Sequence, residues 1–224
     1  MNKKERVKME RKEISKAVIS RLPRYYRYLG ELIEEGVERI SSNELSSRMK
    51  VTASQIRQDL NNFGGFGQQG YGYSIGKLRD EIAAILGLEQ AYGAVIIGAG
   101  NIGQALVHYS GFACEKFRII GVFDVRPEAI GKTVAGCAIR HVQTLAEFAR
   151  QNRVDLGIIC TPKEAAQETA SMLCRLGVRG IWNFAPTDVE VSRGVRLENV
   201  HLSDSLYVLL YHMKQQGDLT EGTK

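Results

Sequence analysis

The sequence predicts an α/β protein whose N-terminal third is helical and whose remainder forms a parallel sheet with helices on both sides. Three observations predict this fold class. Short apolar runs alternate with helix-length segments from residue 93 onward. Helix-capping motifs occur in the first 80 residues, and the net excess of positive charge lies in those same 80 residues. The two parts therefore differ in both structure and charge.

The second part of the chain alternates strand and helix patterns. Apolar runs at 94–97, 118–124, 155–161 and 178–184 have the length of buried strands. Between them lie helical segments such as 163–176, whose small and apolar side chains are spaced to form one buried face. Strands that alternate with helices of this length predict βαβ units and a parallel sheet.

The first part carries the start and stop signals of short helices. Pro23 is expected to open a helix that stops at Gly36. Two capping boxes, Ser41–Glu44 and Thr52–Gln55, begin two further helices that are close together in the sequence. Two short helices joined by a tight turn are typical of a helix-turn-helix.

The second of these helices, over about residues 53–62, has an apolar and a polar face. Ile56, Leu60 and Phe63 form the predicted buried stripe. The opposite face consists of Ser54, Gln55, Arg57, Gln58 and Asn61. Arginine and amide side chains make paired hydrogen bonds to base edges in the major groove, although an ordinary solvated face has the same composition. The glycine-rich run "FGGFGQQGYGY" that follows predicts a hairpin, the wing of a winged helix.

The charge distribution favours a nucleic-acid partner for the first part. Residues 1–80 contain 16 Lys and Arg against 10 Asp and Glu, a net +6, whereas residues 81–224 contain 14 against 15, a net −1. A basic segment joined to a nearly neutral one indicates an anionic partner, nucleic acid first. A mildly basic solvated face is the alternative.

Membrane and metal partners are not expected. No apolar run approaches the roughly 20 residues of a membrane span, and the charged N-terminus lacks a secretory signal pattern. The four cysteines are far apart and show no metal-ligand spacing, which argues against a zinc site or a disulfide framework. We expect a cytoplasmic protein.

The segment from Gly98 to Gly103 reads G-x-G-x-x-G, with an apolar strand before it and a helical pattern after it. Gly98 permits the tight turn, Gly100 the approach of a dinucleotide pyrophosphate, and Gly103 the close packing of helix on strand. The anion would meet free N–H groups at the start of that helix. The remaining residues of the loop are Ala99, Asn101 and Ile102.

Asp124 follows Gly103 by 21 residues, at the end of the next predicted strand. A carboxylate there accepts hydrogen bonds from ribose hydroxyls and repels a 2′-phosphate, which favours NAD(H) over NADP(H). Arg126 nearby is a residue type that accommodates such a phosphate. Another nucleotide or CoA is the alternative ligand.

A catalytic group is missing from the expected site. The strand ends "CTP" (160–162) and "NFAPTD" (183–188) offer amide and apolar groups but no acid, base or nucleophile. Hydride transfer to a carbonyl needs a proton donor, so an NAD-dependent dehydrogenase or reductase with a basic extension is the weaker alternative. The chain ends in the apolar helical segment "SDSLYVLLYHMKQQ", which we expect to mediate dimerisation.

The segments "SRLPRYYRYL", "SSNELSSRMKVTASQIRQDLNNFGGFGQQGYGY", "GAGNIGQAL", "FDV", "NFAP" and "ENV" together resemble the Rex family of redox-sensing repressors over nearly the whole chain. The resemblance implies a homodimer with a winged helix-turn-helix domain (1–80), a Rossmann-type NAD(H) domain (81–202), and a domain-swapped C-terminal helix with its tail (203–224). It implies binding of double-stranded operator DNA when NADH is low, release when NADH binds, and no catalysis.

The resemblance also implies site residues. The expected DNA contacts are Arg24, Ser54, Gln55, Arg57, Gln58, Asn61, Gly70 and Tyr73. The expected NADH or NAD⁺ contacts are Gly98, Ala99, Gly100, Asn101, Ile102, Gly103, Tyr109, Asp124, Val125, Thr161, Pro162, Asn183 and Phe184.

Two departures from the family pattern affect these expectations. The family commonly has a basic residue after the recognition arginine, where this chain has Gln58, and Ser-Tyr in place of Asn61 and Asn62. The operator sequence is therefore left open. The family's switch pairs an arginine, here Arg27, with an aspartate where this chain has His201, so Asp204, or Tyr109 with local packing, is expected to take over that role.

Overall fold

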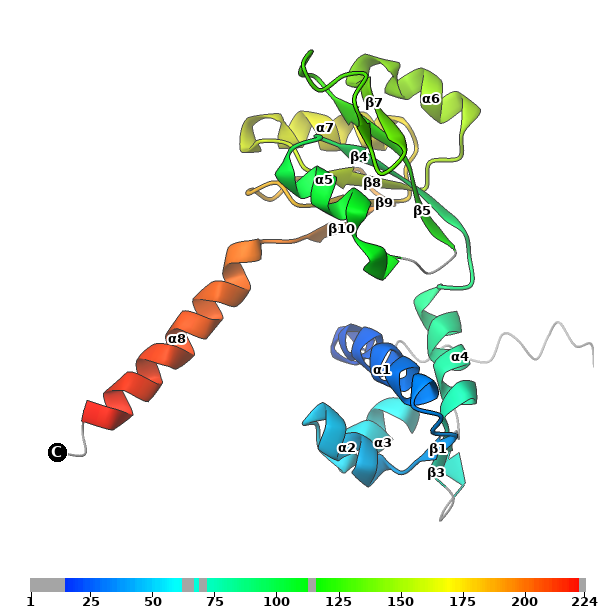
Figure 1. The fold of residues 1–224 in the computed structure, drawn as a ribbon, viewed down its shortest axis with the longest axis vertical. Helices are drawn as coiled ribbons and strands as arrows, with labels where there is room; N and C mark the ends of the chain where they lie inside the picture. The colour runs from blue at the N-terminus through cyan, green and yellow to red at the C-terminus, as the bar shows by residue number, and fades with distance from the viewer. Residues whose placement is uncertain (1–14, 62–66, 69–71, 113–115, 222–224) are drawn as a thin grey trace, which may run out of the picture. The chain divides into compact units, whose positions relative to one another are not determined.

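The computed structural model describes residues 15–61, 67–68, 72–112 and 116–221, which fall into two compact units that divide between Gln90 and Ala91 (Figure 1). This division comes later than the expected boundary after residue 80. Helix α4 (Ile75–Leu86) packs against α1 (Lys16–Glu34), and its buried residues Ile75, Leu78 and Ile82 belong to the core of the first unit. That packing extends the first unit through α4.

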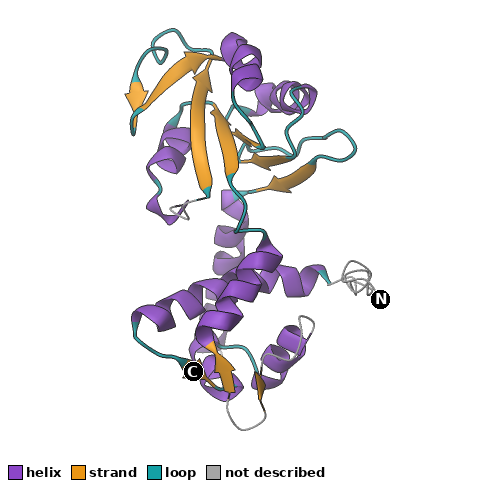
Figure 2. Cartoon of the chain, turned by 90° about the vertical axis from the view of Figure 1, so that its right-hand side faces the viewer, coloured by secondary structure: helices purple, strands orange, loops and turns teal. Residues whose placement is uncertain are grey.

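The first unit has the winged helix-turn-helix arrangement. After α1 come β1 (Arg39–Ile40), α2 (Ser42–Met49), α3 (Ala53–Asn61), β2 (Gly67–Gln68) and β3 (Gly72–Ser74), followed by α4. Strand β3 lies between β1 and β2 and is antiparallel to both (Figure 2). The hairpin of β2 and β3 is the predicted wing, and Phe63 and Gly70 lie outside the described residues.

Helix α1 begins earlier than expected. Its N-cap is Ser15, whose hydroxyl accepts the N–H of Val18 at 3.4 Å, so Pro23 lies inside the helix instead of opening it. Apolar residues on one face are buried on both sides of the proline. They are Val18, Leu22, Tyr25, Leu29 and Leu32. Burial of this continuous face outweighs the single hydrogen bond that proline removes. The predicted stop is confirmed, since the C-cap is Glu35 and Gly36 has φ +75°.

The helix-turn-helix is held by the caps that the sequence predicts. At the start of α2 both hydrogen bonds of the Ser41–Glu44 capping box are present. At the start of α3 the Thr52 hydroxyl accepts the N–H of Gln55 at 3.2 Å. Lys50, with φ +52°, makes the tight turn between the two helices. These caps fix where each helix begins.

The second unit is a doubly wound α/β domain. Its strands are β4 (Tyr92–Ile97), β5 (Phe117–Asp124), β6 (Thr133–Val134), β7 (Cys137–His141), β8 (Leu156–Ile159), β9 (Gly180–Asn183) and β10 (Arg196–Asn199). The spatial order is β10-β9-β8-β4-β5-β7-β6, and every neighbouring pair is parallel except β6 with β7. The chain therefore reverses its direction across the sheet between β4 and β8, which is where such sheets bind ligands.

Helices cover both faces of this sheet (Figure 2). Val95 and Ile97 of β4 pack on one side, in a cluster with α6 (Leu145–Gln151) and α7 (Lys163–Arg175). Ala94 and Ile96 point to the opposite side, in a cluster that α5 (Asn101–His108) joins. The alternation of β4 side chains thus explains why the strand reads as a continuous apolar run.

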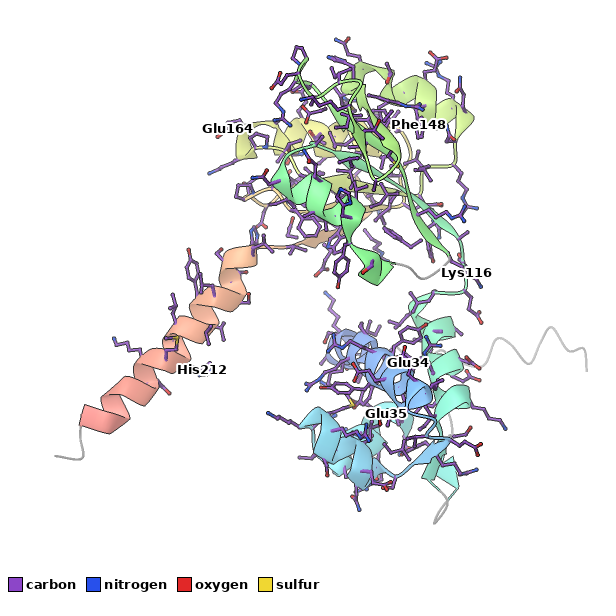
Figure 3. All side chains as sticks on the ribbon, viewed as in Figure 1. Glu34, Glu35, Lys116, Phe148, Glu164 and His212 are labelled. Carbon is purple, nitrogen blue, oxygen red and sulfur yellow. The ribbon has the colours of Figure 1, made fainter. Side chains whose placement is uncertain are left out.

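Helix α8 (Leu202–Glu221) ends the second unit and leaves a large apolar surface uncovered. Leu206, Leu209, Leu210 and Met213 are 48–56% exposed. Figure 3 shows the side chains of α8, including the labelled His212, extending away from the helix. Among the described residues no helix is long and apolar enough to cross a membrane, and no group of three acidic, histidine or cysteine side chains could hold a metal ion.

Candidate dinucleotide cavity and DNA-reading surface

A cavity of about 700 Å³ lies at the carboxyl ends of β4, β5 and β8. The predicted cofactor residues that line it are Gly98, Gly100, Asn101, Ile102, Asp124, Val125, Thr161 and Pro162. It sits where the strand order reverses, as the ligand sites of open α/β sheets do.

The three glycines of the turn are required for different reasons. A Cβ on Gly98 would lie 2.4 Å from the carbonyl oxygen of Cys160, and this residue has φ +102°. A Cβ on Gly103 would lie 2.0 Å from the carbonyl oxygen of Gly98. A Cβ on Gly100 would meet nothing within 4 Å. The fold therefore requires Gly98 and Gly103, whereas the space at Gly100, at the start of α5, is open to a ligand.

Asp124 ties the end of β5 to the glycine turn. Its carboxylate accepts the N–H of Ala99 at 2.7 Å and makes an ion pair with Arg126 at 2.9 Å. Burial by itself raises the pKa of Asp124, but the hydrogen bonds from Arg126 and Ala99 outweigh it and lower the pKa to about 2. The carboxylate is ionised at neutral pH, yet only 5% exposed.

The turn after β8 contributes a buried hydroxyl. Thr161 Oγ1 has no hydrogen-bond partner among the described residues and lines the cavity. A buried hydroxyl without a partner in the protein is costly, which suits it to a ligand. Burial raises the pKa of the adjacent Cys160 thiol to about 12, which disfavours the nucleophilic thiolate form at neutral pH.

Three residues expected at the nicotinamide end do not line the cavity. The Asn183 amide is fully buried and already used: it donates to the Thr187 carbonyl at 2.7 Å and accepts the N–H of Ala185 at 3.0 Å. The Asn183 side chain thus has a structural role in the turn after β9, and its contact with a ligand stays a prediction. Phe184 packs against Trp182, with ring centroids 4.7 Å apart. Tyr109 is 58% exposed at the end of α5.

The sequence reading missed one wall of the cavity. Helix α7 lines it with Ala165, Glu168, Thr169, Met172 and Arg175. Their spacing of three and four residues places them on one helix face. In the sequence this face overlaps the predicted buried face of the helix at Ala165 and Thr169, so the pattern indicates packing and not a cavity wall.

The candidate DNA-reading surface, as the sequence predicts it, is one face of α3. Ser54, Arg57, Gln58 and Asn61 are exposed there. Arg57 donates from Nη1 to the hydroxyl of Ser42 on α2 at 2.8 Å, so its guanidinium is held at the helix-turn-helix surface.

Two further residues expected to contact DNA lie on neighbouring elements. Arg24 on α1 donates to the carbonyl of Met49. Tyr73 is only 8% exposed and belongs to the hydrophobic core, and its contact with DNA stays a prediction. The alternation along β3 directs this ring inward.

The buried carboxylate of Asp59 is not predicted from the sequence. Asp59 on α3 is 0% exposed and accepts hydrogen bonds from Arg21 and Tyr25 of α1 and from Gln55. Burial raises the pKa of Asp59, but these bonds outweigh it and lower the pKa below its ordinary value. The Gln55 amide is therefore engaged within the protein, and the residue is partly buried.

The expected switch residues lie in both units. Arg27 is exposed on α1, with its guanidinium 5.7 Å from the centre of the Tyr28 ring. His201 Nε2 lies 3.0 Å from Asp188 Oδ1, within the second unit. The Asp204 N–H donates to the His201 carbonyl at 3.1 Å in the first turn of α8. His201 thus already has an acidic partner, and the side chain of Asp204 is exposed.

Comparison with known proteins covers both units. The family model described as "Putative DNA-binding protein N-terminus" matches residues 13–61, and that described as "CoA binding domain" matches residues 89–187. The "Redox-sensing transcriptional repressor Rex" of Thermoanaerobacter pseudethanolicus is 51% identical over 204 residues, 91% of each chain. That of Clostridioides difficile is 51% identical over 204 residues, 91% of this chain and 97% of the other. The chain belongs to the Rex family.

Solved structures of the Rex-family repressor RSP agree with this assignment. RSP in complex with beta-NAD+ and operator DNA has a TM-score of 0.86 and 50% identity, with 93% of this chain and 96% of that chain covered. RSP in complex with beta-NADH has a TM-score of 0.84 and 48% identity, with 95% and 99% covered. The Rex relatives are named as repressors, which confirms a transcriptional repressor and not the dehydrogenase alternative.

Proposed function

We propose that this Rex-family chain is a homodimeric repressor that reads operator DNA with α3 and leaves it when NADH enters the cavity of the second unit. The observation that carries the proposal is the pairing of a helix-turn-helix with an open glycine turn at Gly100 in one chain. The RSP complexes, one with NAD⁺ and operator DNA and one with NADH, support it.

The residues present fit a dinucleotide. The open space at Gly100 lets the pyrophosphate approach the N–H groups that begin α5. The Asp124 carboxylate lines the cavity as a negative charge that would repel a 2′-phosphate, and the buried Thr161 hydroxyl offers a polar partner to the bound molecule. Because Arg126 is paired with Asp124, it is not free to bind a 2′-phosphate, which favours NAD(H) over NADP(H).

The bound dinucleotide supplies a nicotinamide ring that is cationic when oxidised and neutral when reduced. Apolar groups that line the cavity, such as Ile102, Val125 and Pro162, would make the cation costly to hold, so the proposal gives NADH the higher affinity. A ligand changes a conformation only through its different affinity for the two states. We infer that NADH favours a dimer whose two α3 helices do not match two half-sites one DNA turn apart.

The proposed dimer uses α8. Its exposed leucines and Met213 would be covered by a second copy of the chain, with the C-terminal helices exchanged between protomers. A symmetric dimer presents two α3 helices to a palindromic operator. The proposal assigns DNA binding to the first unit, NAD(H) to the second, dimerisation to α8, and the cytoplasm as location.

Selection of bound DNA from a random pool tests the proposal. The full-length protein is expected to enrich a palindromic sequence, and NADH should abolish the enrichment while NAD⁺ should not. Fluorescence anisotropy with the selected duplex at fixed salt then measures the loss of affinity. Enrichment that persists at saturating NADH would contradict the sensor, and the absence of any enriched sequence would contradict the repressor.

A further inference from the structure

The recognition helix α3 carries a carboxylate that cannot touch DNA. Asp59 is 0% exposed, yet four hydrogen bonds converge on its two oxygens. Arg21 donates from Nε to Oδ2 and from Nη2 to Oδ1, each at 2.7 Å. The Tyr25 hydroxyl donates to Oδ2 at 2.9 Å, and Gln55 Nε2 donates to Oδ1 at 2.8 Å.

The sequence builds this network from two helical pairs. Arg21 and Tyr25 are four residues apart on α1, and Gln55 and Asp59 are four residues apart on α3. Each pair lies on one face of its helix, so the two faces meet at the carboxylate. Neither pair stands out in the sequence as a charge pattern.

The geometry of the ion pair fixes more than the distance between the helices. Apolar packing by Leu22, Ile56 and Leu60 holds α1 near α3, but hydrophobic attraction has no direction. A bidentate arginine–carboxylate pair is directional, because the planar fork requires both oxygens in its plane. The pair therefore sets the rotation of α3 about its own axis as well as its separation from α1.

The same carboxylate also sets the orientation of Gln55. Because the amide nitrogen donates to Asp59, Gln55 cannot swing freely toward a base. On the exposed side of α3, Arg57 is held in turn by Ser42. The side chains that face the DNA thus start from defined positions, and reading of base edges needs groups placed to within about 0.5 Å.

We propose that Asp59 is a positioning residue for DNA reading, which acts without touching the DNA by fixing α3 against α1 and the Gln55 side chain on α3. Loss of the network should leave the phosphate contacts intact, because these contacts tolerate small displacements of the helix. It should weaken base discrimination, because contacts to base edges do not tolerate such displacements. This inference rests on the proposed function, because it concerns how α3 reads an operator.

The test compares operator and scrambled duplexes. Asp59→Asn keeps the shape and removes the charge, and its ratio of operator to scrambled affinity should fall at least about tenfold, as expected when a buried charge loses its partner. Arg21→Lys keeps a positive charge but not the planar guanidinium, so its ratio of operator to scrambled affinity should fall less than that of Arg21→Gln. Tyr25→Phe removes one hydroxyl and should lower the ratio about threefold.

The matched control is Glu35→Gln. Glu35, labelled in Figure 3, pairs with Arg48 of α2 at 2.7 Å in the same unit, so its replacement leaves the bonds to Asp59 described above in place. This variant should keep the wild-type ratio. All variants should bind NADH within about twofold of the wild type, and their affinity for scrambled DNA should keep its dependence on salt.

The outcomes separate the inference from the function. A folded Asp59→Asn protein with the wild-type ratio overturns the inference. If that variant fails to fold, Arg21→Lys and Tyr25→Phe decide, and wild-type ratios in both overturn it equally. A wild-type protein with no preference for any operator overturns the proposed function instead.

Discussion

The carboxylate of Asp124 accepts the backbone N–H of Ala99 at 2.7 Å, which joins the end of β5 to the glycine turn after β4. The two elements proposed to hold a dinucleotide are thus connected through this hydrogen bond. This buried contact gives the protein a measurable dependence on acid.

Replacement of Asp124 by Asn should remove part of the acid sensitivity of folding. The pKa of Asp124 is lowered to about 2, so its ionised form stabilises the fold above the ordinary aspartate value, and that stability is lost as the pH falls through the folded pKa. Between about pH 4 and pH 2 the wild type should lose on the order of 2 kcal/mol relative to Asp124→Asn. Urea unfolding followed by circular dichroism measures this, with Asp80→Asn, an exposed site on α4, as the control.

A side chain at Gly100 should separate sensing from folding. Gly100→Val places its Cβ in open space, so it should cost only about 1 kcal/mol at the helix N-cap, while NADH affinity falls at least about 100-fold because the pyrophosphate can no longer approach. Operator binding should persist at high NADH. The matched variant Gly103→Val meets the Gly98 carbonyl and should cost more than about 3 kcal/mol of stability. Calorimetric titration with NADH and thermal melting distinguish the two, and normal NADH binding by Gly100→Val would place the pyrophosphate elsewhere.

Truncation of Arg57 should remove operator recognition alone. Arg57→Ala should lower operator affinity by about 1–3 kcal/mol and leave NADH binding unchanged. Ser42→Ala, which removes the hydroxyl that holds the guanidinium, should lose less operator affinity than Arg57→Ala. Anisotropy at fixed salt provides the measurement, with Lys77→Ala, an exposed cation on α4, as the control. A wild-type affinity for Arg57→Ala would mean that α3 is not the recognition helix.

The switch should depend on Asp204. Since His201 is paired with Asp188, we expect the exposed Asp204 to be the acidic partner of Arg27 in one state of the protein. Asp204→Ala should bind NADH and operator with affinities within about threefold of the wild type but require more NADH for release, because coupling between sites is lost. Release at the wild-type NADH concentration would instead assign the switch to Tyr109 and local packing.

The apolar surface of α8 should control the oligomeric state. Leu206 and Leu210 are 50% and 48% exposed, so Leu206→Glu combined with Leu210→Glu should convert a dimer to a monomer in light scattering. Ser203→Glu, at the start of the same helix, should remain dimeric. A dimeric double variant would show that the subunits meet elsewhere.

The sequence patterns predict most of the parallel strands and the helix α7, whereas the start of α1 depends on tertiary packing that the local sequence does not show. The predicted strands and the helix over 163–176 match β4, β5, β8, β9 and α7 closely, because their apolar periods are set by burial. Pro23 predicts a helix start because proline favours the first turn of a helix, but α1 begins earlier because its buried face continues on both sides of Pro23. The local sequence pattern alone cannot show that burial of a long helix face outweighs the hydrogen bond lost at an internal proline.

The site residues could be predicted from the sequence where the backbone geometry requires one particular residue type. The glycines and Asp124 were found because a turn, a close approach and a strand end each require one residue type. The burial of Asn183 and Tyr73 is not visible in the sequence, and the role of Asp59 is hidden because its partners on α1 are distant in sequence. The role of a buried polar side chain depends on contacts that no single helix or strand reveals.

The contact between Trp182 and Phe184 gives the second unit an optical property. Trp182 is the only tryptophan of the chain, and Phe184 follows β9, the strand that carries it, in the unit that contains the proposed site. A reduced nicotinamide ring absorbs light in the range where tryptophan emits, whereas the oxidised ring does not. Occupancy by NADH should therefore be visible as energy transfer from a single native chromophore, which would let the two redox forms be told apart in the unlabelled protein.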